Sequence, residues 1–377
     1  MSDLDLLYTE LEDDLRASVR GLLADRCPPS AVLALYDGDR SAVAPLWKAI
    51  AADLGLAGLL VPEERGGSGA SAREAAVVLE ELGRAAAPAP FLTSSVVATT
   101  VLLAAPPGGA ADELLAGLAA GDRTAALLLP LATTAGTDAP TVHLDADGRL
   151  DGRVTSVAGA LEADVLLVPV ATPEGTAVRA VAAADATVDP VTSLDMTRQL
   201  ADVTLSFAAG REVLPAGAGG DAVRRALEVG TALLASEQLG IAQWCLTTTV
   251  GYLKERRQFG RVVGGFQALK HRLADLYVAT ESAAAAARYA AATTAADDPD
   301  RAVATAVAQA FCADVAVRAA EEAVQLHGGL GMTWEHPAHL YLKRAKADQI
   351  AFGTSGVHRA RLAALVDLPA APAVSAG

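Results

Sequence analysis

The sequence has few cysteines, few aromatic residues and less positive than negative charge. Its 377 residues include three cysteines, and Phe, Trp and Tyr make up 4% of the chain. Cys27, Cys245 and Cys312 are far apart and lack the CxxC or Cys/His spacing of a zinc site, so we expect reduced core thiols and no metal centre. Asp and Glu number 45 against 30 Lys and Arg, which gives a net charge of -15. An acidic chain does not attract a polyanion, so we expect no nucleic-acid partner.

Long uninterrupted apolar runs are also missing. The run 96–105 is only about half the length of roughly 20 residues that a membrane helix needs, and two prolines end it. The N-terminus, MSDLDLLYTELEDDL, is acidic and has neither the basic nor the apolar region of a signal peptide. We therefore expect a cytoplasmic protein with no membrane partner.

The residues that are abundant predict a chain in three parts. Hydrophobic residues make up 52%, and alanine dominates them, which favours helix. Helical periodicity covers 1–121, short β-branched runs separated by turns cover 122–213, and helical periodicity returns over 221–368. Asp147-Gly148 predicts a hairpin inside the β part. The Pro- and Ala-rich tail 369–377 is expected to fray.

One stretch of the last part reverses the charge of the chain. Between Lys254 and Arg272 the sequence has six basic residues and one acidic residue. A solvated helix end is one interpretation, because cations favour the C-terminal end of a helix dipole. An anionic ligand is the other, and the run Gln258, Phe259, Gly260 directly after the cations favours a phosphate beside a flat ring.

A second stretch, 325–337, carries three glycines within four residues at an expected helix end, which would let a ligand or another backbone approach closely. His327, His336 and His339 lie in or just after this stretch. No carboxylate or thiol stands at ligand spacing on the same helix face, so capping or core roles are expected for them rather than metal binding.

Together these stretches resemble the acyl-CoA dehydrogenase family. The resemblance rests on R-R-Q-F-G-R-x-x-x-x-F-Q-x-x-K-H-x-L-A-D, on Q-L-H-G-G-L-G-M-T-W-E-H-P, and on K-R-A-K-A-D-Q-I with G-T-S after it. It implies an α+β, mainly α fold with an N-terminal helical domain, a middle β-barrel-like domain and a C-terminal four-helix bundle. It also implies FAD as cofactor, an acyl-CoA substrate and an acceptor similar to electron-transfer flavoprotein.

In that family the flavin lies between subunits, so the resemblance assigns cofactor contacts to named residues. The diphosphate and adenosine half of a neighbouring chain's FAD would contact Arg256, Gln258 and Phe259. The same groove would be lined by Gln325, Gly328 and Gly329, because backbone N–H groups and a guanidinium satisfy phosphates. Thr354 of the G-T-S motif is a further cofactor-binding candidate.

The chain departs from the family at the catalytic base. The usual glutamate directly before the G-T pair is Phe352 here, and the alternative position, 29 residues before the motif Phe, is Gly230. Neither residue can accept a proton. Glu237 follows Gly230 by seven residues, about 10 Å along a helix, which makes it only a weak candidate base. Glu228 and Asp348 rank below it.

The β part departs as well. Family members carry an acidic-Pro loop that holds the flavin ring and a tryptophan-containing strand that covers it. The corresponding segments here are 129–138 and 154–159, and neither contains tryptophan. The segment 195–198, Asp-Met-Thr-Arg, is retained and is expected to lead into the last strand. The half-site for the chain's own flavin ring is therefore eroded, whereas the half-site lent to a neighbour is intact.

Three hypotheses follow from this asymmetry. The first is that the chain is the non-catalytic subunit of a heterotetrameric acyl-CoA dehydrogenase, whose homologous partner supplies the glutamate and the ring seat. The second is a self-sufficient homomeric dehydrogenase that uses Glu237 as a displaced base. The third is a flavin-free interaction protein, against which the intact diphosphate motif argues.

Overall fold

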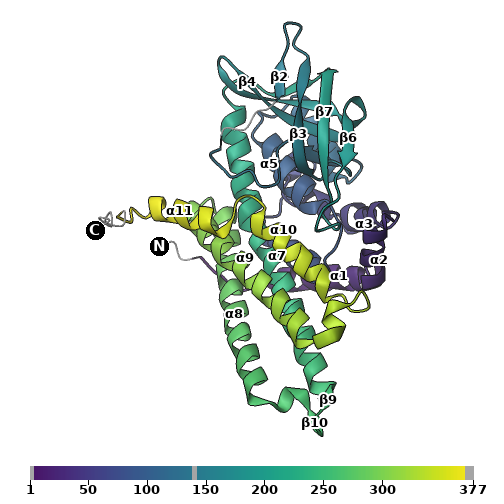
Figure 1. The fold of residues 1–377 in the computed structure, drawn as a ribbon. Coiled ribbons are helices and arrows are strands. Elements are labelled where there is room, and N and C mark those ends of the chain that lie inside the picture. Colours follow the sequence, from purple (N-terminus) through teal and green to yellow (C-terminus); the bar gives the residue numbers. More distant parts are fainter. Residues whose placement is uncertain (1–3, 138–141, 370–377) are drawn as a thin grey trace, which may run out of the picture.

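The computed structural model describes residues 4–137 and 142–369, which fold into three consecutive parts of the chain (Figure 1). Helices come first, an antiparallel-rich sheet lies in the middle, and long helices complete the chain. The expected fold class is confirmed. The expected frayed tail falls almost entirely on 370–377, which lie outside the described residues, as does Asp138 of the eroded loop.

The N-terminal part is helical, as its periodicity predicts. Thr9 caps the first helix in a capping box with Glu12, and Ser71 and Glu74 form a second box at the start of α4. The segment Phe91–Ala98 is π-helical and entirely buried. The helices of this part are α1 (Glu10–Arg26), α2 (Pro29–Ala34), α3 (Val43–Lys48), α4 (Ala72–Arg84), α5 (Thr99–Leu103) and α6 (Ala110–Ala119).

The middle part is one sheet with its own small core. Its path runs β6-β7-β3-β2-β4-β5-β8, and β1 pairs with β4 in parallel. The predicted hairpin at Asp147-Gly148 is confirmed, because β2 and β3 pair antiparallel on either side of it. The strands are β1 (Ala125–Leu127), β2 (Val142–Leu144), β3 (Leu150–Ala158), β4 (Val165–Thr172), β5 (Gly175–Ala182), β6 (Thr187–Pro190), β7 (Leu200–Ala208) and β8 (Arg211–Leu214).

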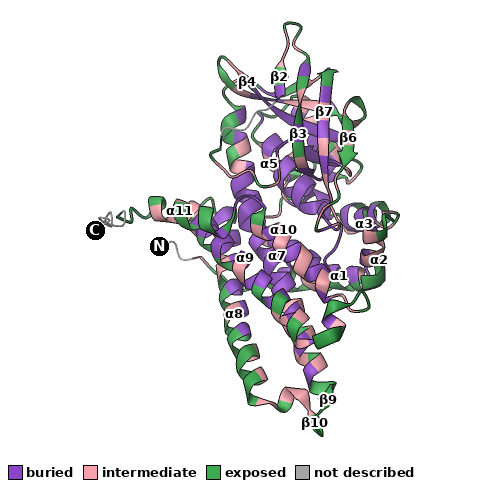
Figure 2. Cartoon of the chain, viewed as in Figure 1, coloured by how far each residue is buried: buried purple, intermediate pink, exposed green. Residues whose placement is uncertain are grey.

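The C-terminal bundle is built around one long helix. α7 has 37 residues and so spans about 55 Å. It packs against α4, α8 and α9, and Figure 2 shows its middle buried among these neighbours. The elements are α7 (Gly219–Glu255), β9 (Arg257–Gln258), β10 (Arg261–Val262), α8 (Gln267–Ala295), α9 (Arg301–Leu326), α10 (Ala338–Ile350) and α11 (Ser355–Leu365).

Among the described helices, α9 is long and apolar enough to cross a membrane by length and composition alone. Its most apolar window is 67% buried inside the protein, against α7, α8, α10 and α11. The apolarity of α9 therefore serves the core of the bundle. The three cysteines are also buried and unpaired, which confirms the expectation of reduced core thiols.

Candidate functional site

The two positions at which the family carries its base face each other in this structure. Gly230 lies in the buried middle of α7, and Phe352 follows the end of α10. A Cβ atom built on Gly230 would lie 3.2 Å from Cζ of Phe352 and 2.8 Å from Cγ2 of Val97. The Phe352 ring thus occupies the space beside Gly230. An apolar ring and a glycine stand where catalytic relatives need a carboxylate.

The backbone at Phe352 is held in an unusual conformation. Its φ of 54° lies in the left-handed region, which a bulky residue adopts only under constraint. The constraint comes from both sides: the Phe352 N–H donates to the carbonyl of Leu131 at 2.8 Å, and the Phe352 carbonyl lies 3.0 Å from Nε2 of His358. Gln309 donates to the carbonyl of Ala351 at 3.2 Å and fixes the preceding residue.

Little room is left beside this ring. The cavity lined by Phe352, Val97 and Leu131 has a volume of about 30 Å³, enough for one or two water molecules. The rest of its lining is almost wholly apolar and consists of Thr93, Leu127, Leu129, Pro130, Ala158 and Leu227. The chain's own acyl position is therefore filled by its own side chains.

The segments expected to seat a flavin ring pack directly against the end of α10. Any Cβ on Gly353 would collide with the side chain of Thr134, and any Cβ on Gly159 would collide with Thr93. Ser156 in β3 has a φ of 59°, a second strained residue in this region. The backbone of these segments is tightly packed and locally strained, but their described residues provide neither the covering tryptophan nor an acidic loop residue.

Glu237 is not an available base. Its side chain is 1% exposed and accepts hydrogen bonds from Arg344 at 2.6 Å and Arg198 at 2.6 Å. Burial raises the pKa of Glu237, but the two guanidinium groups outweigh burial and hold that pKa well below its usual range. A carboxylate whose pKa is lowered by two bound cations is a poor base for removing a proton from a substrate. These buried ion pairs argue against the weak assignment of Glu237 as a displaced base.

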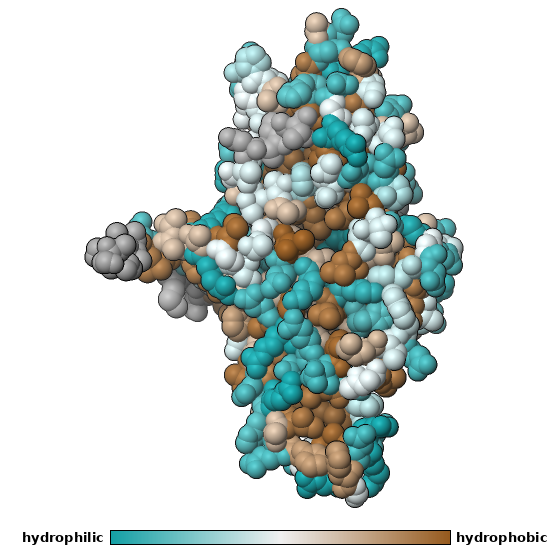
Figure 3. Space-filling view, in the orientation of Figure 1, coloured by the Kyte–Doolittle hydropathy of each residue, from teal (hydrophilic) through white to brown (hydrophobic). Residues whose placement is uncertain are grey.

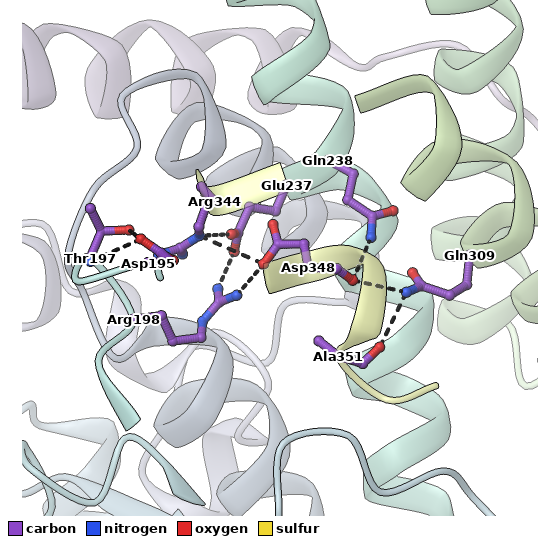
Figure 4. A network of polar contacts seen from close by, with 9 residues as sticks. All are labelled: Asp195, Thr197, Arg198, Glu237, Gln238, Gln309, Arg344, Asp348 and Ala351. Atoms are coloured by element: carbon purple, nitrogen blue, oxygen red, sulfur yellow. Dashed lines mark hydrogen bonds and ion pairs between the residues drawn. The ribbon is translucent and has the colours of Figure 1, made fainter. Parts of the chain in front are cut away.

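Glu237 belongs to a buried ion network that joins three segments (Figure 4). Asp348 of α10 accepts from Arg198 at 2.5 Å, and Arg344 lies 3.3 Å from Asp195. The segment 195–198 leads into β7, as expected, and the side chains of Asp195, Thr197 and Arg198 are buried in the core. Three carboxylates face two guanidinium groups. Burial and the charge of Glu237 raise the pKa of Asp348 well above its usual range.

The sequence contained a signal for this network. Glu237 interrupts a stretch of α7, 226–242, in which the structure buries every residue. A charged residue inside an apolar helix stretch of that length requires a buried partner. The periodicity of single elements cannot say which cations meet it, because the partners come from segments about 40 and 107 residues away along the chain.

The expected contacts to a neighbour's flavin are exposed at the far end of the bundle, where the β9–β10 hairpin joins α7 to α8 (Figure 1). Phe259 and Gly260 form its two-residue loop with φ values of 52° and 72°, as a tight hairpin turn requires. The Phe259 side chain is 85% exposed, and the Arg256 and Gln258 side chains are exposed beside it. Arg256 has no ion-pair partner within 4–137 and 142–369.

The second cofactor segment lies at the same end of the bundle. Tyr252 in the last turn of α7 and His327 at the end of α9 stack with their ring centroids 4.5 Å apart. Next to His327, Gln325, Gly328 and Gly329 are exposed. No described atom lies within 4 Å of a Cβ built on either glycine, so the backbone there is open to a ligand. An unpaired guanidinium and an open glycine turn fit a diphosphate.

Thr354 does not join these residues. It caps α11 and lies beyond α10, whose 13 residues separate it from the glycine turn by about 20 Å. Its neighbour Gly353 packs on Thr134 of the eroded loop. Thr354 therefore belongs to the side of the chain's own ring seat.

Among the histidines of the second stretch, His327 is buried, whereas His336 and His339 are half-buried and His336 accepts the N–H of Ala338 at the start of α10. His327 is 2% exposed, and its Nδ1 lies 2.7 Å from the carbonyl of Ala323. Burial lowers the pKa of His336 and of His339 to about 4. Within the described residues, no group of three His, Cys, Asp or Glu side chains could hold a metal ion.

Comparison with known proteins identifies this arrangement. Residues 9–122 match the model for the N-terminal domain of acyl-CoA dehydrogenases, and residues 217–366 match that for the C-terminal domain. The chain is 37% identical over 331 residues to acyl-CoA dehydrogenase IpdE2 of Mycobacterium tuberculosis, covering 88% of this chain and 89% of that protein. The chain belongs to the acyl-CoA dehydrogenase family. This is a family of oxidoreductases that use FAD, which confirms the expected class of enzyme and cofactor.

Two solved structures are similar to this chain over almost its whole length. The ChsE4-ChsE5 complex from Mycobacterium tuberculosis matches with a TM-score of 0.85 and 29% identity, covering 98% of this chain and 100% of that chain. A variant of the steroid acyl-CoA dehydrogenase Tcur3481-Tcur3483 matches with a TM-score of 0.81 and 29% identity, covering 95% and 98%. Both of these acyl-CoA dehydrogenase neighbours are named as pairs of proteins.

Proposed function

We propose that this chain is the non-catalytic subunit of a heteromeric acyl-CoA dehydrogenase, and that it contributes half of a flavin site to a homologous catalytic subunit. The observation that carries the proposal is the contact between Phe352 and Gly230, with only about 30 Å³ of space beside it. No titratable group of the described residues reaches that space, so this chain cannot remove the α-proton of a thioester by itself.

The half that faces a neighbour supports the same conclusion. Arg256, Gln258 and Phe259 are exposed on a rigid hairpin, and the glycine turn at 328–329 is exposed nearby. When bound, FAD would accept the β-hydride of the acyl chain in the partner's site. The residues of this chain would hold its diphosphate, with Arg256 supplying charge and the glycine turn supplying N–H groups.

Large apolar side chains are exposed near the hairpin and the glycine turn, which suits a contact with another protein. Figure 3 shows hydrophobic residues gathered at the lower end of the bundle, on the face drawn there. Phe259 is 85% exposed, Met332 80% and Trp334 61%. Large exposed apolar side chains on adjoining segments are typical of protein interfaces.

The two other hypotheses receive less support. A self-sufficient homomer would need a base, and Glu237 is locked between Arg198 and Arg344. A flavin-free interaction protein would not need an unpaired arginine beside an open glycine turn. We infer a steroid-derived acyl-CoA as substrate of the assembled enzyme from the name of the steroid acyl-CoA dehydrogenase Tcur3481-Tcur3483, and an acceptor similar to electron-transfer flavoprotein from the family.

Co-expression with a homologous subunit that carries the glutamate and the tryptophan tests the proposal. The chain alone should purify with little FAD and no acyl-CoA-dependent reduction of an electron acceptor. The mixed complex should hold about one FAD for each pair of chains and be active, because each complete site needs one half from each subunit. A yellow homo-oligomer of this chain with one FAD per chain would overturn the proposal.

A further inference from the structure

A groove outside both flavin half-sites is rich in arginine. It lies between α1, α4, α7 and α8 and has a volume of about 330 Å³. Four arginines from three of these helices line it: Arg16, Arg20, Arg84 and Arg288. Such a cluster is unusual in a chain whose net charge is -15.

The carboxylates of the groove do not use up these cations. Arg16 pairs with Glu80 at 2.8 Å and with Glu81 at 3.1 Å, and Arg20 pairs with Glu81 at 2.7 Å. Arg84 lies 3.7 Å from Glu81 at its nearest and also donates to Gln243. Glu281 also lines the groove, but it forms no ion pair with these arginines within the described residues. The ion pairs of the four guanidinium groups thus involve only two carboxylates, Glu80 and Glu81.

Several donors of these arginines are buried without a partner. Nη2 of Arg16, Nε of Arg84 and Nε of Arg288 donate to no group in the described part of the chain. Arg288 forms no ion pair there either. The guanidinium carbon of Arg288 lies 4.3 Å from the centroid of the Tyr8 ring, and that of Arg16 lies 4.4 Å from the same centroid. Buried donors without acceptors are costly, and they show that the chain's own acceptors do not satisfy these guanidinium groups.

The environment of Arg84 also disfavours its positive charge. Burial lowers the pKa of Arg84, and the like charges of Arg20 and Arg16 lower it further, against the opposing effect of Glu81. A negative group bound at this point would relieve both the burial and the repulsion.

We propose that this groove binds a small organic anion, whose carboxylate or phosphate is held by Arg16, Arg84 and Arg288. The groove is much larger than the anionic group alone, and Tyr277 and Leu246 line the remainder. Tyr277 is 55% exposed and offers a ring face. The ligand therefore carries an apolar ring or chain next to its charge. This site is independent of the flavin half-site, which lies at the hairpin end of the same helices.

Titration calorimetry on the full-length chain tests the site with two probes, phenyl phosphate and benzoate, each at a constant ionic strength set with sodium chloride. At least one probe should bind saturably, and the stronger of the two tells whether the groove prefers phosphate or carboxylate. Arg288→Gln should weaken that binding at least tenfold, because a charge-assisted contact is lost while no carboxylate of the chain is left unpaired.

Arg272→Gln is the matched control, since it makes the same change on the same helix outside the groove, where Arg272 pairs with Glu322. This control should bind as the unmodified chain does. If Arg288→Gln does not fold, Arg84→Gln provides the same comparison. Hydrogen exchange of the unmodified chain should show protection of α8 around Arg288 when the probe is added. Absence of saturable binding by both probes, equal binding by the groove variants, or protection confined to other regions would overturn the proposal.

Discussion

At the scale of single residues, Gly230 and Phe352 form a close apolar contact at the two positions where the resemblance places the family's base. The ring fills the space beside Gly230 and leaves a cavity of only about 30 Å³, so the apolar contacts of the core are preserved. Gly230 is required because the ring and Val97 leave no room for a Cβ atom. The two positions have become a packing pair.

This packing makes a prediction that a helix-propensity argument alone would get wrong. Gly230→Ala should destabilise the chain by about 1–3 kcal/mol, because its Cβ would overlap Val97 in a filled core. Gly251→Ala, on the exposed side of the same helix and with no described atom within 4 Å of its Cβ, should stabilise by about 0.5–1 kcal/mol. Urea unfolding of both variants measures the difference, and a stabilising Gly230→Ala would contradict the packing described.

Restoring the base should not restore activity. Phe352→Glu puts a carboxylate into an apolar space of about 30 Å³, where it lacks hydrogen-bond donors and should cost a few kcal/mol of stability, about 2–4. The flavin ring still has no seat, so we expect no acyl-CoA-dependent bleaching of flavin by the chain alone. Phe352→Ala controls for loss of the ring, and bleaching by Phe352→Glu without a partner would favour the homomeric hypothesis.

The buried network makes stability depend on pH in two opposite ways. The folded pKa of Glu237 is lowered, so its contribution is present above the unfolded value of about 4.3 and is lost as pH falls below it. The folded pKa of Asp348 is raised, so the free energy of unfolding decreases as pH rises from about 3.9 toward the folded value. The Glu237 effect changes stability below about pH 4.3, and the Asp348 effect changes it above about pH 3.9.

Two amide substitutions separate these effects. Asp348→Asn mimics the protonated carboxyl. It should keep or raise the free energy of unfolding at pH 8, where the raised pKa of Asp348 lowers the stability of the unmodified chain. Glu237→Gln leaves two buried guanidinium groups short of a charge and should cost about 3–5 kcal/mol. Chemical unfolding at pH 5 and pH 8 measures both variants. An equal loss for the two substitutions would show that Asp348 is charged in the folded state.

At the scale of elements, the β9–β10 hairpin carries the residues that we propose for contact with a neighbour's flavin. Its loop is fixed by two left-handed residues, and Arg261 stacks on Phe266 at 3.8 Å, which ties the hairpin to the start of α8. The shape of the hairpin is therefore set by contacts within the chain. A preformed contact binds without the entropy cost of ordering a loop.

Arg256→Ala should weaken FAD binding by the mixed complex about ten- to a hundredfold, since a charge-assisted contact to a diphosphate contributes about 1.5–3 kcal/mol. Folding should be unaffected because the side chain is exposed. Flavin fluorescence on dilution of the complex gives the affinity. Arg153→Ala, the same change at an exposed arginine of β3, should leave it unchanged, and equal retention of FAD by both variants would remove Arg256 from the site.

The elements also mark what a sequence can and cannot reveal. Periodicity, turn residues and the Asp147-Gly148 hairpin were sufficient for the three-part fold, because each is a local signal. The motif residues at 256–259 and 325–329 could be assigned to one site through resemblance, and the structure brings both to one end of the bundle. The ion network was not predictable in detail, because Asp195, Glu237 and Arg344 meet only after three separate segments pack.

At the scale of the whole molecule, the chain separates a filled site from an open one. The filled site lies where the end of α10 meets the middle sheet, and the open one lies at the hairpin, at the opposite end of the bundle (Figure 1). The buried network between Arg198, Glu237 and Asp348 joins the segment before β7 to both α7 and α10. In the proposed heteromer, the hairpin would face the second subunit.

The positions of the three tryptophans give this molecule an optical property. Trp47 is 8% exposed and Trp244 stacks on Tyr341 with ring centroids 3.6 Å apart, whereas Trp334 is 61% exposed beside the glycine turn. The red edge of the emission spectrum therefore belongs to Trp334. When a partner covers that surface, the emission should move to shorter wavelength, and Trp334→Phe should abolish the shift. The chain carries its own spectroscopic label for assembly, so the association can be followed without an attached dye.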